Sequence, residues 1–396
     1  MRLSTLISAF ALSAIPALAS VVETESLEDE SASVPSELYS HAGNATHYGG
    51  LNTDFVPDWD IRDLANDVEV EDRDTHELSA RAASCFPAIG FTPPQGRAPS
   101  IPAYKWWCDR RTEYAFMGFS YDVNSCPSKA LMARSFKQMR QQYKARYVRI
   151  YGACTSNHAF YDQIVAAAYE AGVGVYGLIW FGFNGPSDKN WEGQLNGLIK
   201  TIKTNRYAPY VIRSVAIGSE PLYDGAIQAN ELVNKIVATR KQISALGVHV
   251  STSEMAYKLA QYVNVLGVTD SVQLNLLPFF SSSASIGNST SAHQQVIKEL
   301  DQMKAATRGT KKLLVTQTGW PSNTAVWKPN SRSARADIFN EQKYYDMLDG
   351  FCWTFKRYPA GGVGWFAHIW EDNDLPGWGI VKNGIAKIVF RPKTQC

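Results

Sequence analysis

Glu220 is the first residue in this sequence that could carry catalytic chemistry. It follows the apolar run 211–217, which predicts a buried strand, so its carboxyl would be partly desolvated, as suits a general acid. A structural glutamate in a salt bridge is the alternative. Retaining cleavage of a glycosidic bond needs a second carboxylate about 5–5.5 Å from the first.

Gln317 occupies the place where that second group is expected. The short apolar and β-branched run 312–316 predicts a strand, which Gly319, Trp320 and Pro321 bring to an end. In parallel α/β barrels the active-site residues follow the strands in this way. An amide cannot ionise, so Gln317 is a very poor nucleophile.

The other predicted strand ends are rich in aromatic rings and carboxylates and poor in cations. Flat rings and hydrogen-bonding carboxylates suit sugars, whereas an anionic substrate would require Lys or Arg. Trp180 and Phe280 could instead belong to the barrel core, whereas Trp320 and Trp378, each beside a glycine, favour a cleft or surface role. The candidate substrate-binding residues are Tyr151, Trp180, Ser219, Tyr223, Glu254, Phe280, Trp320, Trp370 and Glu371.

Other chemistries have little support in the sequence. The histidines have no metal-ligand spacing, and neither a Gly-x-Ser-x-Gly elbow nor a phosphate-binding loop is present. We therefore predict no metal and no cofactor. The sequence contains no basic run interleaved with aromatic residues, so we predict no binding of nucleic acid.

The elements that must position these residues alternate between strand and helix. Alternation of this kind requires parallel crossovers, and the span of the strands matches the roughly 250 residues of a (β/α)8 TIM barrel. Strands are predicted near 115–121, 146–151, 173–181, 211–217, 248–252, 271–277, 312–316 and 363–369. Helices are predicted over 128–142, 158–171, 191–205, 226–246, 292–307 and 337–356, with a weaker one over 255–265.

Three segments precede the barrel, which is predicted over 115–396. Residues 1–19 carry Arg2, an apolar stretch and a small-residue run, typical of a signal peptide. Residues 20–81 are acidic and predicted to be disordered, and 82–114 form a Pro- and Cys-rich lead-in. We expect a secreted protein with no membrane span, and glycosylation sequons lie at Asn44 and Asn288.

The acidic leader gives the chain an uneven charge. Residues 20–80 hold 16 acidic residues against Arg62 and Arg73, a net of −14, whereas the whole chain carries +2. The leader is therefore either a pro-segment that shields a basic body or a solvated tail.

Six cysteines in a secreted chain indicate three disulfides, with 15 possible pairings. Order along the chain suggests three neighbouring pairs, and a free buried cysteine is the alternative. The middle pair is the best supported, because each of its cysteines follows one of two adjacent strands. The suggested pairs are Cys85 with Cys108, Cys126 with Cys154, and Cys352 with Cys396.

Four segments resemble glycoside hydrolase family 17, whose members are β-1,3-glucanases and glucan transglycosylases. Residues 314–322 resemble its Val-Val-Val-x-Glu-Thr-Gly-Trp-Pro-Ser nucleophile segment, and 216–220 resemble its Val-Gly-Asn-Glu acid segment. Residues 149–154 and 275–280 fit strands two and six of fungal cell-wall members. The resemblance covers about 115–385. It implies a secreted or wall-bound protein that acts on β-1,3-glucan by a retaining mechanism, with Glu220 as the general acid/base. We expect a monomer.

The sequence departs from this family at three positions. The nucleophile position is Gln317, the asparagine before the acid is Ser219, and the tyrosine or histidine of strand six is Leu277. Two main functions remain open, a hydrolase or transglycosylase with a modified site and a non-catalytic glucan-binding wall protein. A third is a structural barrel without sugar affinity. Glu254 or Glu371 could also activate water and give an inverting hydrolase.

Overall fold

The computed structural model of the chain describes residues 85–152, 154–182, 187–285 and 290–396. The predicted signal peptide, the acidic leader and both sequons, at Asn44 and Asn288, lie outside the described residues. The boundaries drawn between the predicted segments remain predictions.

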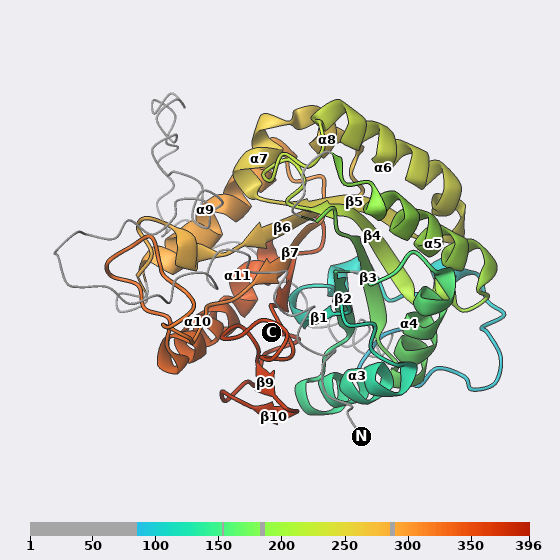
Figure 1. Cartoon of the computed structure of the whole chain (residues 1–396), viewed down its shortest axis with the longest axis horizontal. Helices are drawn as coiled ribbons and strands as arrows, with labels where there is room; N and C mark the ends of the chain where they lie inside the picture. Colours follow the sequence, from blue (N-terminus) through green and yellow to red (C-terminus); the bar gives the residue numbers. More distant parts are fainter. Residues whose placement is uncertain (1–84, 153, 183–186, 286–289) are drawn as a thin grey trace, which may run out of the picture. The chain divides into compact units, whose positions relative to one another are not determined.

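Eight parallel strands close into a barrel in which each strand pairs with its neighbours in chain order and β8 pairs with β1. The predicted TIM barrel is therefore confirmed (Figure 1). The barrel strands are β1 (Ala115–Asp122), β2 (Tyr147–Tyr151), β3 (Gly174–Ile179), β4 (Ile212–Ser219), β5 (His249–Glu254), β6 (Val272–Leu276), β7 (Leu313–Thr318) and β8 (Val363–Ala367). Almost every strand residue is buried, because helices cover the outside of the sheet and side chains fill the inside.

Helices separate the strands and surround the barrel in Figure 1. They are α2 (Ala103–Trp106), α3 (Lys129–Tyr143), α4 (His158–Ala171), α5 (Asn190–Thr204), α6 (Ala229–Ile243), α7 (Ala256–Gln261), α8 (Val263–Val268), α9 (Thr290–Ala306), α10 (Ile338–Gly350) and α11 (Cys352–Arg357). Short 3₁₀ turns are η4 (Arg110–Thr112), η6 (Ala208–Tyr210), η7 (Ser244–Leu246) and η8 (Pro278–Phe280). The helix predicted over 337–356 is interrupted at Phe351, which separates α10, ending at Gly350, from α11.

Local sequence signals fix the ends of several helices. Ser128, Asn157 and Asp337 each accept a backbone N–H of the first turn with the side chain, as N-caps do. Gly172 and Gly247 adopt left-handed φ values of 73° and 80° at the C-terminal ends, as the sequence predicts.

A short hairpin of β9 (Val381–Lys382) and β10 (Ile385–Ala386) follows the barrel. It was not predicted, although its turn residues, Asn383 and Gly384, both have positive φ. An Asn-Gly pair is the strongest short hairpin signal in a sequence, and it was overlooked here because the flanking strands are only two residues long.

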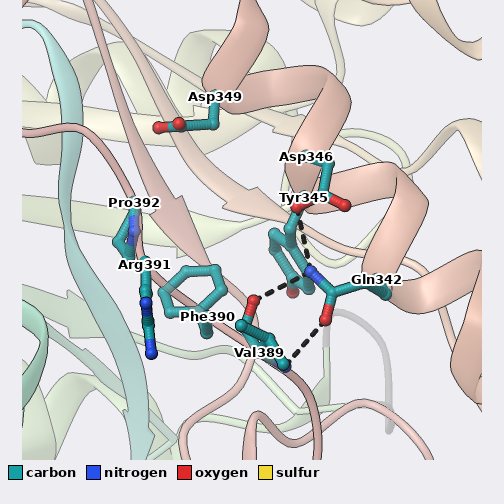
Figure 2. Close-up of a pocket in the computed structure, with 8 residues that line it drawn as sticks. All are labelled: Gln342, Tyr345, Asp346, Asp349, Val389, Phe390, Arg391 and Pro392. Carbon is teal, nitrogen blue, oxygen red and sulfur yellow. Dashed lines mark hydrogen bonds between the residues drawn. The ribbon is translucent and has the colours of Figure 1, made fainter.

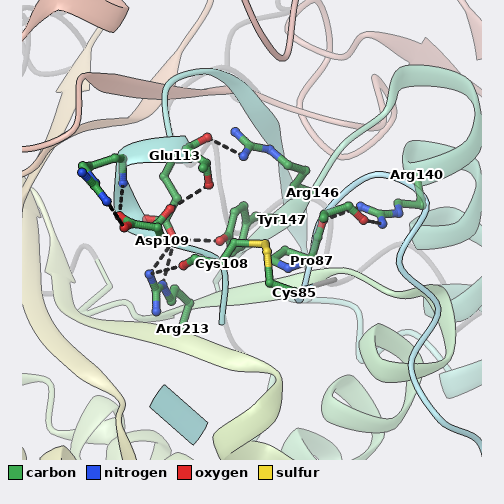
Figure 3. The surroundings of a disulfide bond; sticks show 12 residues. Cys85, Pro87, Cys108, Asp109, Glu113, Arg140, Arg146, Tyr147 and Arg213 are labelled. Carbon is green, nitrogen blue, oxygen red and sulfur yellow. Dashed lines mark hydrogen bonds and ion pairs between the residues drawn. A yellow bond between two sulfur atoms is a disulfide. The ribbon is translucent and has the colours of Figure 1, made fainter. Parts of the chain in front are cut away.

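The lead-in covers the N-terminal end of the barrel. The indole N–H of Trp106 donates to the Tyr210 carbonyl at 2.9 Å, and that of Trp107 donates to the Pro209 carbonyl at 3.1 Å. A disulfide between Cys85 and Cys108 holds the segment (Figure 3). The other two disulfides join Cys126 to Cys154 and Cys352 to Cys396, so all three pairs are those suggested by order along the chain.

A buried ion pair lies beneath the barrel, beside this disulfide in Figure 3. One oxygen of Glu113 accepts hydrogen bonds from Arg213 Nε at 2.8 Å and from the Tyr147 hydroxyl at 2.7 Å. Burial alone would raise the pKa of Glu113. The positive charges of Arg213, Arg110 and Lys312 outweigh it and hold that pKa below its usual range.

The chain ends in a tail that packs on the outer side of β1 and β8. Phe390 contacts the rings of Phe116 and Trp365, and the amide of Gln342 on α10 bonds the backbone of Val389 in both directions. Figure 2 shows the pocket of about 390 Å³ that α10 and this tail enclose. It lies outside the barrel, away from the C-terminal ends of the strands.

Removing Arg213 should destabilise the fold strongly, because Glu113 would remain buried without its partner. We expect Arg213→Met to lower the free energy of unfolding by about 3–5 kcal/mol, measured by urea denaturation. Arg111→Met is the matched control, because its pair with Asp109 is exposed and should contribute only about 0–1 kcal/mol. Equal effects of the two changes would contradict this assignment.

Candidate active site

Arg149 is the central residue of the barrel mouth. It lies in β2 between Tyr147 and Tyr151, and the alternation of a strand turns all three inward. The guanidinium is 1% exposed and reaches three other strands. Nη1 donates to Gln317 Oε1 at 3.4 Å, and Nη2 donates to Ser219 Oγ at 3.3 Å and to Ser253 Oγ at 3.4 Å.

These acceptors are neutral, and the contacts are longer than the roughly 2.7–2.9 Å of a charge-assisted pair. Burial lowers the pKa of Arg149 to about 10, although the nearby Tyr151 and Glu220 oppose the shift. Arg149 remains a cation near neutral pH.

Gln317 lies in β7, opposite Asn275 in the pairing of β6 with β7. Its side chain is 7% exposed, and its amide oxygen accepts the Arg149 hydrogen bond. Within the described residues, no hydrogen bond is formed by its amide nitrogen. The amide is therefore held through its oxygen alone.

Glu220 directly follows β4 and has a positive φ of 57°. The turn is tight, because a Cβ on Gly218 would lie 2.6 Å from the ring of Pro221. The backbone N–H of Glu220 donates to the Ser253 carbonyl at 2.8 Å, and its Oε1 accepts from Asn275 Nδ2, also at 2.8 Å. The half-buried carboxyl is thus oriented by two adjacent strands.

A polar network links the two key positions. Asn275 Nδ2 also donates to Ser219 Oγ at 3.0 Å, which in turn accepts from Arg149. Ser253 Oγ donates to Asn275 Oδ1 at 2.7 Å and lies 2.7 Å from Thr316 Oγ1. Gln317 and Glu220 therefore belong to one continuous set of hydrogen bonds through Arg149, Ser219 and Asn275.

Glu254, predicted to bind substrate, has another role. Its carboxyl is 0% exposed and accepts the backbone N–H groups of Leu222, Tyr223 and Met255 at 2.8, 3.3 and 2.8 Å. Burial and the charge of Glu220 raise the pKa of Glu254 to about 8, against the effect of these donors. Glu254 therefore fixes the loop that presents Glu220.

Aromatic rings form one wall of the mouth. Tyr151 and Trp180, both half-buried, stack with 6.2 Å between ring centroids, and His368 meets Tyr151 edge-on at 5.1 Å. A second group consists of Phe280, Trp327 and Trp378, with Trp378 at 6.1 Å from His368. Burial and the Arg149 charge lower the pKa of His368 to about 3, so its ring is neutral. Tyr223 lies farther along, edge-on to Tyr257.

Trp320 and Trp370, both predicted to bind substrate, are buried in the core. Trp320 is 0% exposed, packs on Phe279 and donates its indole N–H to the Arg335 carbonyl. Trp370 is 2% exposed and packs between Phe119 and Tyr143, behind β1. Both rings are large apolar groups beside a strand end, and both pack into the hydrophobic core. Trp378, given a cleft or surface role, is also buried.

Glu371 is also engaged elsewhere. Its oxygens accept the backbone N–H groups of Asn383 at 2.8 Å and Gly384 at 3.3 Å, so it fastens the β9–β10 turn. The carboxyls of Glu371 and Glu254 are thus both engaged by backbone N–H groups.

The rim around the mouth is acidic. Burial raises the pKa of Asp122 and of Asp224 to about 6 each, and burial with the charges of Asp122 and Glu371 raises that of Asp374 to about 7. Such a rim disfavours anionic substrates. In the part of the chain that the structure describes, no cluster of metal-binding side chains is present and no helix is long and apolar enough to cross a membrane.

Sequence reasoning missed Arg149 and Asn275 as site residues. Both lie within quoted motifs, but no role was assigned to either. The signal was available, because a cation or an amide in the middle of an apolar strand must find partners inside the barrel. The departure at Ser219 is explained in part, since its hydroxyl bonds Arg149 and Asn275, whereas nothing in the structure explains Leu277.

The fold and this site can be compared with known proteins. The β-1,3-glucanosyltransferase of glycoside hydrolase family 17 from Rhizomucor miehei is similar at 24% identity and a TM-score of 0.57. The match covers 70% of this chain and 98% of that chain. An active-site mutant of the Rhizomucor miehei β-1,3-glucanosyltransferase, in complex with laminaritriose, has the same TM-score and coverage at 23% identity. These identities support the likeness of fold alone.

No curated protein matches the chain. A family profile described as the BtgE/BtgC glycoside hydrolase domain matches residues 114–367, which is more than half of the sequence. The chain belongs to the BtgE/BtgC glycoside hydrolase domain family.

Proposed function

We propose that this chain is a secreted cell-wall protein that binds β-1,3-glucan at the mouth of its barrel. We further propose that it does not cleave glucan by the retaining mechanism while residue 317 is glutamine. The observation that carries the proposal is the amide of Gln317, held by Arg149 in the place of a nucleophilic carboxylate.

The chemistry of the mouth supports a neutral sugar as the ligand. Tyr151 and Trp180 offer a half-exposed aromatic wall, and Glu220 and Asn275 offer hydrogen-bonding groups beside it. The similar structure from Rhizomucor miehei holds laminaritriose, a β-1,3-linked sugar.

The second candidate function is hydrolysis or transglycosylation of the same glucan. It is favoured by Glu220, which retains an oriented carboxyl at the end of β4 and a supporting loop fixed by Glu254. In this second function Glu220 would be the general acid/base, and a nucleophile would still be needed at residue 317.

Restoring a carboxylate at residue 317 should restore catalysis. We expect Gln317→Glu to hydrolyse laminari-oligosaccharides at least about 1,000-fold faster than freshly prepared parent protein, with net retention at the anomeric carbon. Chromatography of the products measures the rate, and NMR of the anomeric proton gives the stereochemistry. The double variant Gln317→Glu/Glu220→Gln is the control and should be inactive. Retaining cleavage by the fresh parent through a covalent intermediate would contradict the proposal.

The aromatic wall should carry much of the affinity for glucan. Trp180→Ala should weaken laminari-oligosaccharide binding by about 10-fold or more in calorimetry, because a large stacked ring would be lost from the site. Trp353→Ala is the matched control, since Trp353 is exposed on α11 and its loss should leave the affinity unchanged. If the two variants bind equally well, the sugar does not lie against Trp180.

The buried carboxyl of Glu254 should make stability depend on pH. Its folded-state pKa of about 8 lies above its unfolded value, so the folded protein holds a proton that the unfolded chain releases. Its contribution to stability should therefore fall between about pH 4.5 and pH 8, by at most about 1.4 kcal/mol per pH unit.

Glu254→Gln should remove this contribution, because an amide does not titrate. The difference in the free energy of unfolding between parent and variant, measured by urea denaturation across that range, should change with pH in this direction. A constant difference would show that Glu254 is ionised throughout.

A further inference from the structure

We propose that Gln317 is a self-modification site, at which the side-chain amide is hydrolysed within the barrel mouth to a carboxylate. The hydrolysis itself needs no glucan. Its consequence, conversion of a glucan-binding protein into a retaining hydrolase, rests on the proposed function.

Arg149 supplies the first requirement, stabilisation of negative charge on the amide oxygen. When water attacks the side-chain carbon of Gln317, the charge develops on Oε1, to which Arg149 Nη1 already donates at 3.4 Å. The guanidinium is 1% exposed, and a fixed cation in such a dry site stabilises an oxyanion far better than it would in water.

Glu220 supplies the second requirement, a carboxylate that can move protons. It is half-buried at the mouth and shares one hydrogen-bond network with Gln317, through Asn275, Ser219 and Arg149. Asn275 is also the residue that pairs with Gln317 across β6 and β7. Glu220 is therefore joined to Gln317 by a continuous set of hydrogen bonds.

The leaving group is also unrestrained. No described residue accepts a hydrogen bond from Gln317 Nε2, so departure of this nitrogen breaks no contact with the protein. The amide of Gln273, on β6, differs in this respect, because its nitrogen donates to Ser214 Oγ at 3.0 Å.

The reaction balances with water as the only co-reactant. Glu220 takes a proton from water as the water oxygen bonds the side-chain carbon of Gln317. The bond from that carbon to Nε2 then breaks, and the nitrogen leaves with the proton from Glu220 as ammonia. The acid formed at residue 317 ionises, and the ammonia takes up its proton.

The product relieves an electrostatic imbalance. Arg149 is a buried cation whose bonded acceptors are all neutral, and a buried charge is stabilised by a hydrogen-bonded partner of opposite sign. A carboxylate at residue 317 would provide that partner without a change of size. The modification should therefore be favourable and, in water, irreversible.

Peptide mapping of the intact mature protein during incubation in heavy-oxygen water tests the proposal. The peptide containing Gln317 should gain the amide-to-acid mass difference together with one heavy oxygen. Two glutamines of the same molecule serve as controls, Gln273 matched for burial and Gln142 exposed. Gln317 should react at least about 100-fold faster than either, the size of effect expected for one oxyanion donor.

Variants separate the roles of the two groups. Glu220→Gln should slow the reaction at Gln317 to the rate of the control glutamines, and Arg149→Lys should slow it if that variant folds. Reaction of Gln317 no faster than Gln273 and Gln142 in the parent protein would overturn the proposal, whatever the variants do. An unchanged rate in Glu220→Gln would overturn the role of Glu220.

Activity assays on the same samples distinguish this proposal from the proposed function. Hydrolysis of laminari-oligosaccharides should rise in proportion to the fraction of modified Gln317. Modification without hydrolysis would support the self-modification and overturn its link to glucan cleavage. Hydrolysis that precedes any modification would overturn the link as well.

Discussion

The burial of Arg149 without a bonded carboxylate is the constraint on which the functional end of this barrel depends. Its guanidinium joins β2 to β4, β5 and β7 through three long bonds to neutral oxygens. At the opposite end of the barrel, Arg213 bonds Glu113 at 2.8 Å. Burial would lower the pKa of Arg213, but the charge of Glu113 raises it above its usual value. Arg149 has no such bonded carboxylate, and burial lowers its pKa. At the N-terminal end of the barrel the buried arginine is paired with a carboxylate. At the C-terminal end Arg149 has no bonded anion, and a ligand or a new carboxylate could provide one.

The fold could be predicted because each barrel element carries its own signal. Short apolar runs alternate with helical patterns, and the glycines at 172 and 247 end helices where left-handed φ is required. Element boundaries differ from the prediction by a few residues. The exceptions are the divided helix at Gly350 and the β9–β10 hairpin, whose signals are too short to stand out from the surrounding loop.

The site was only partly predictable, because the position of a residue at a strand end does not reveal which neighbouring residues its side chain contacts. Glu220 directly follows β4 and Gln317 lies near the end of β7, so both stand at strand ends, as the sequence predicts. Trp320 and Trp370 also follow strands, yet both pack into the core, since burying a large ring is favourable wherever the surrounding helices leave room. Two backbone partners of Glu254, Leu222 and Tyr223, lie 32 and 31 residues earlier in the chain, so only the folded chain shows its role.

The departures from the glycoside hydrolase pattern form one connected change. Ser219 accepts from both Arg149 and Asn275, and the Asn275 amide on β6 also donates to Glu220. A site that had merely decayed would not be expected to keep Glu220 bonded at 2.8 Å and its loop fixed by a buried carboxyl. An oriented carboxyl beside a non-ionising Gln317 fits a site that binds sugar, or one in which a carboxylate appears only after folding.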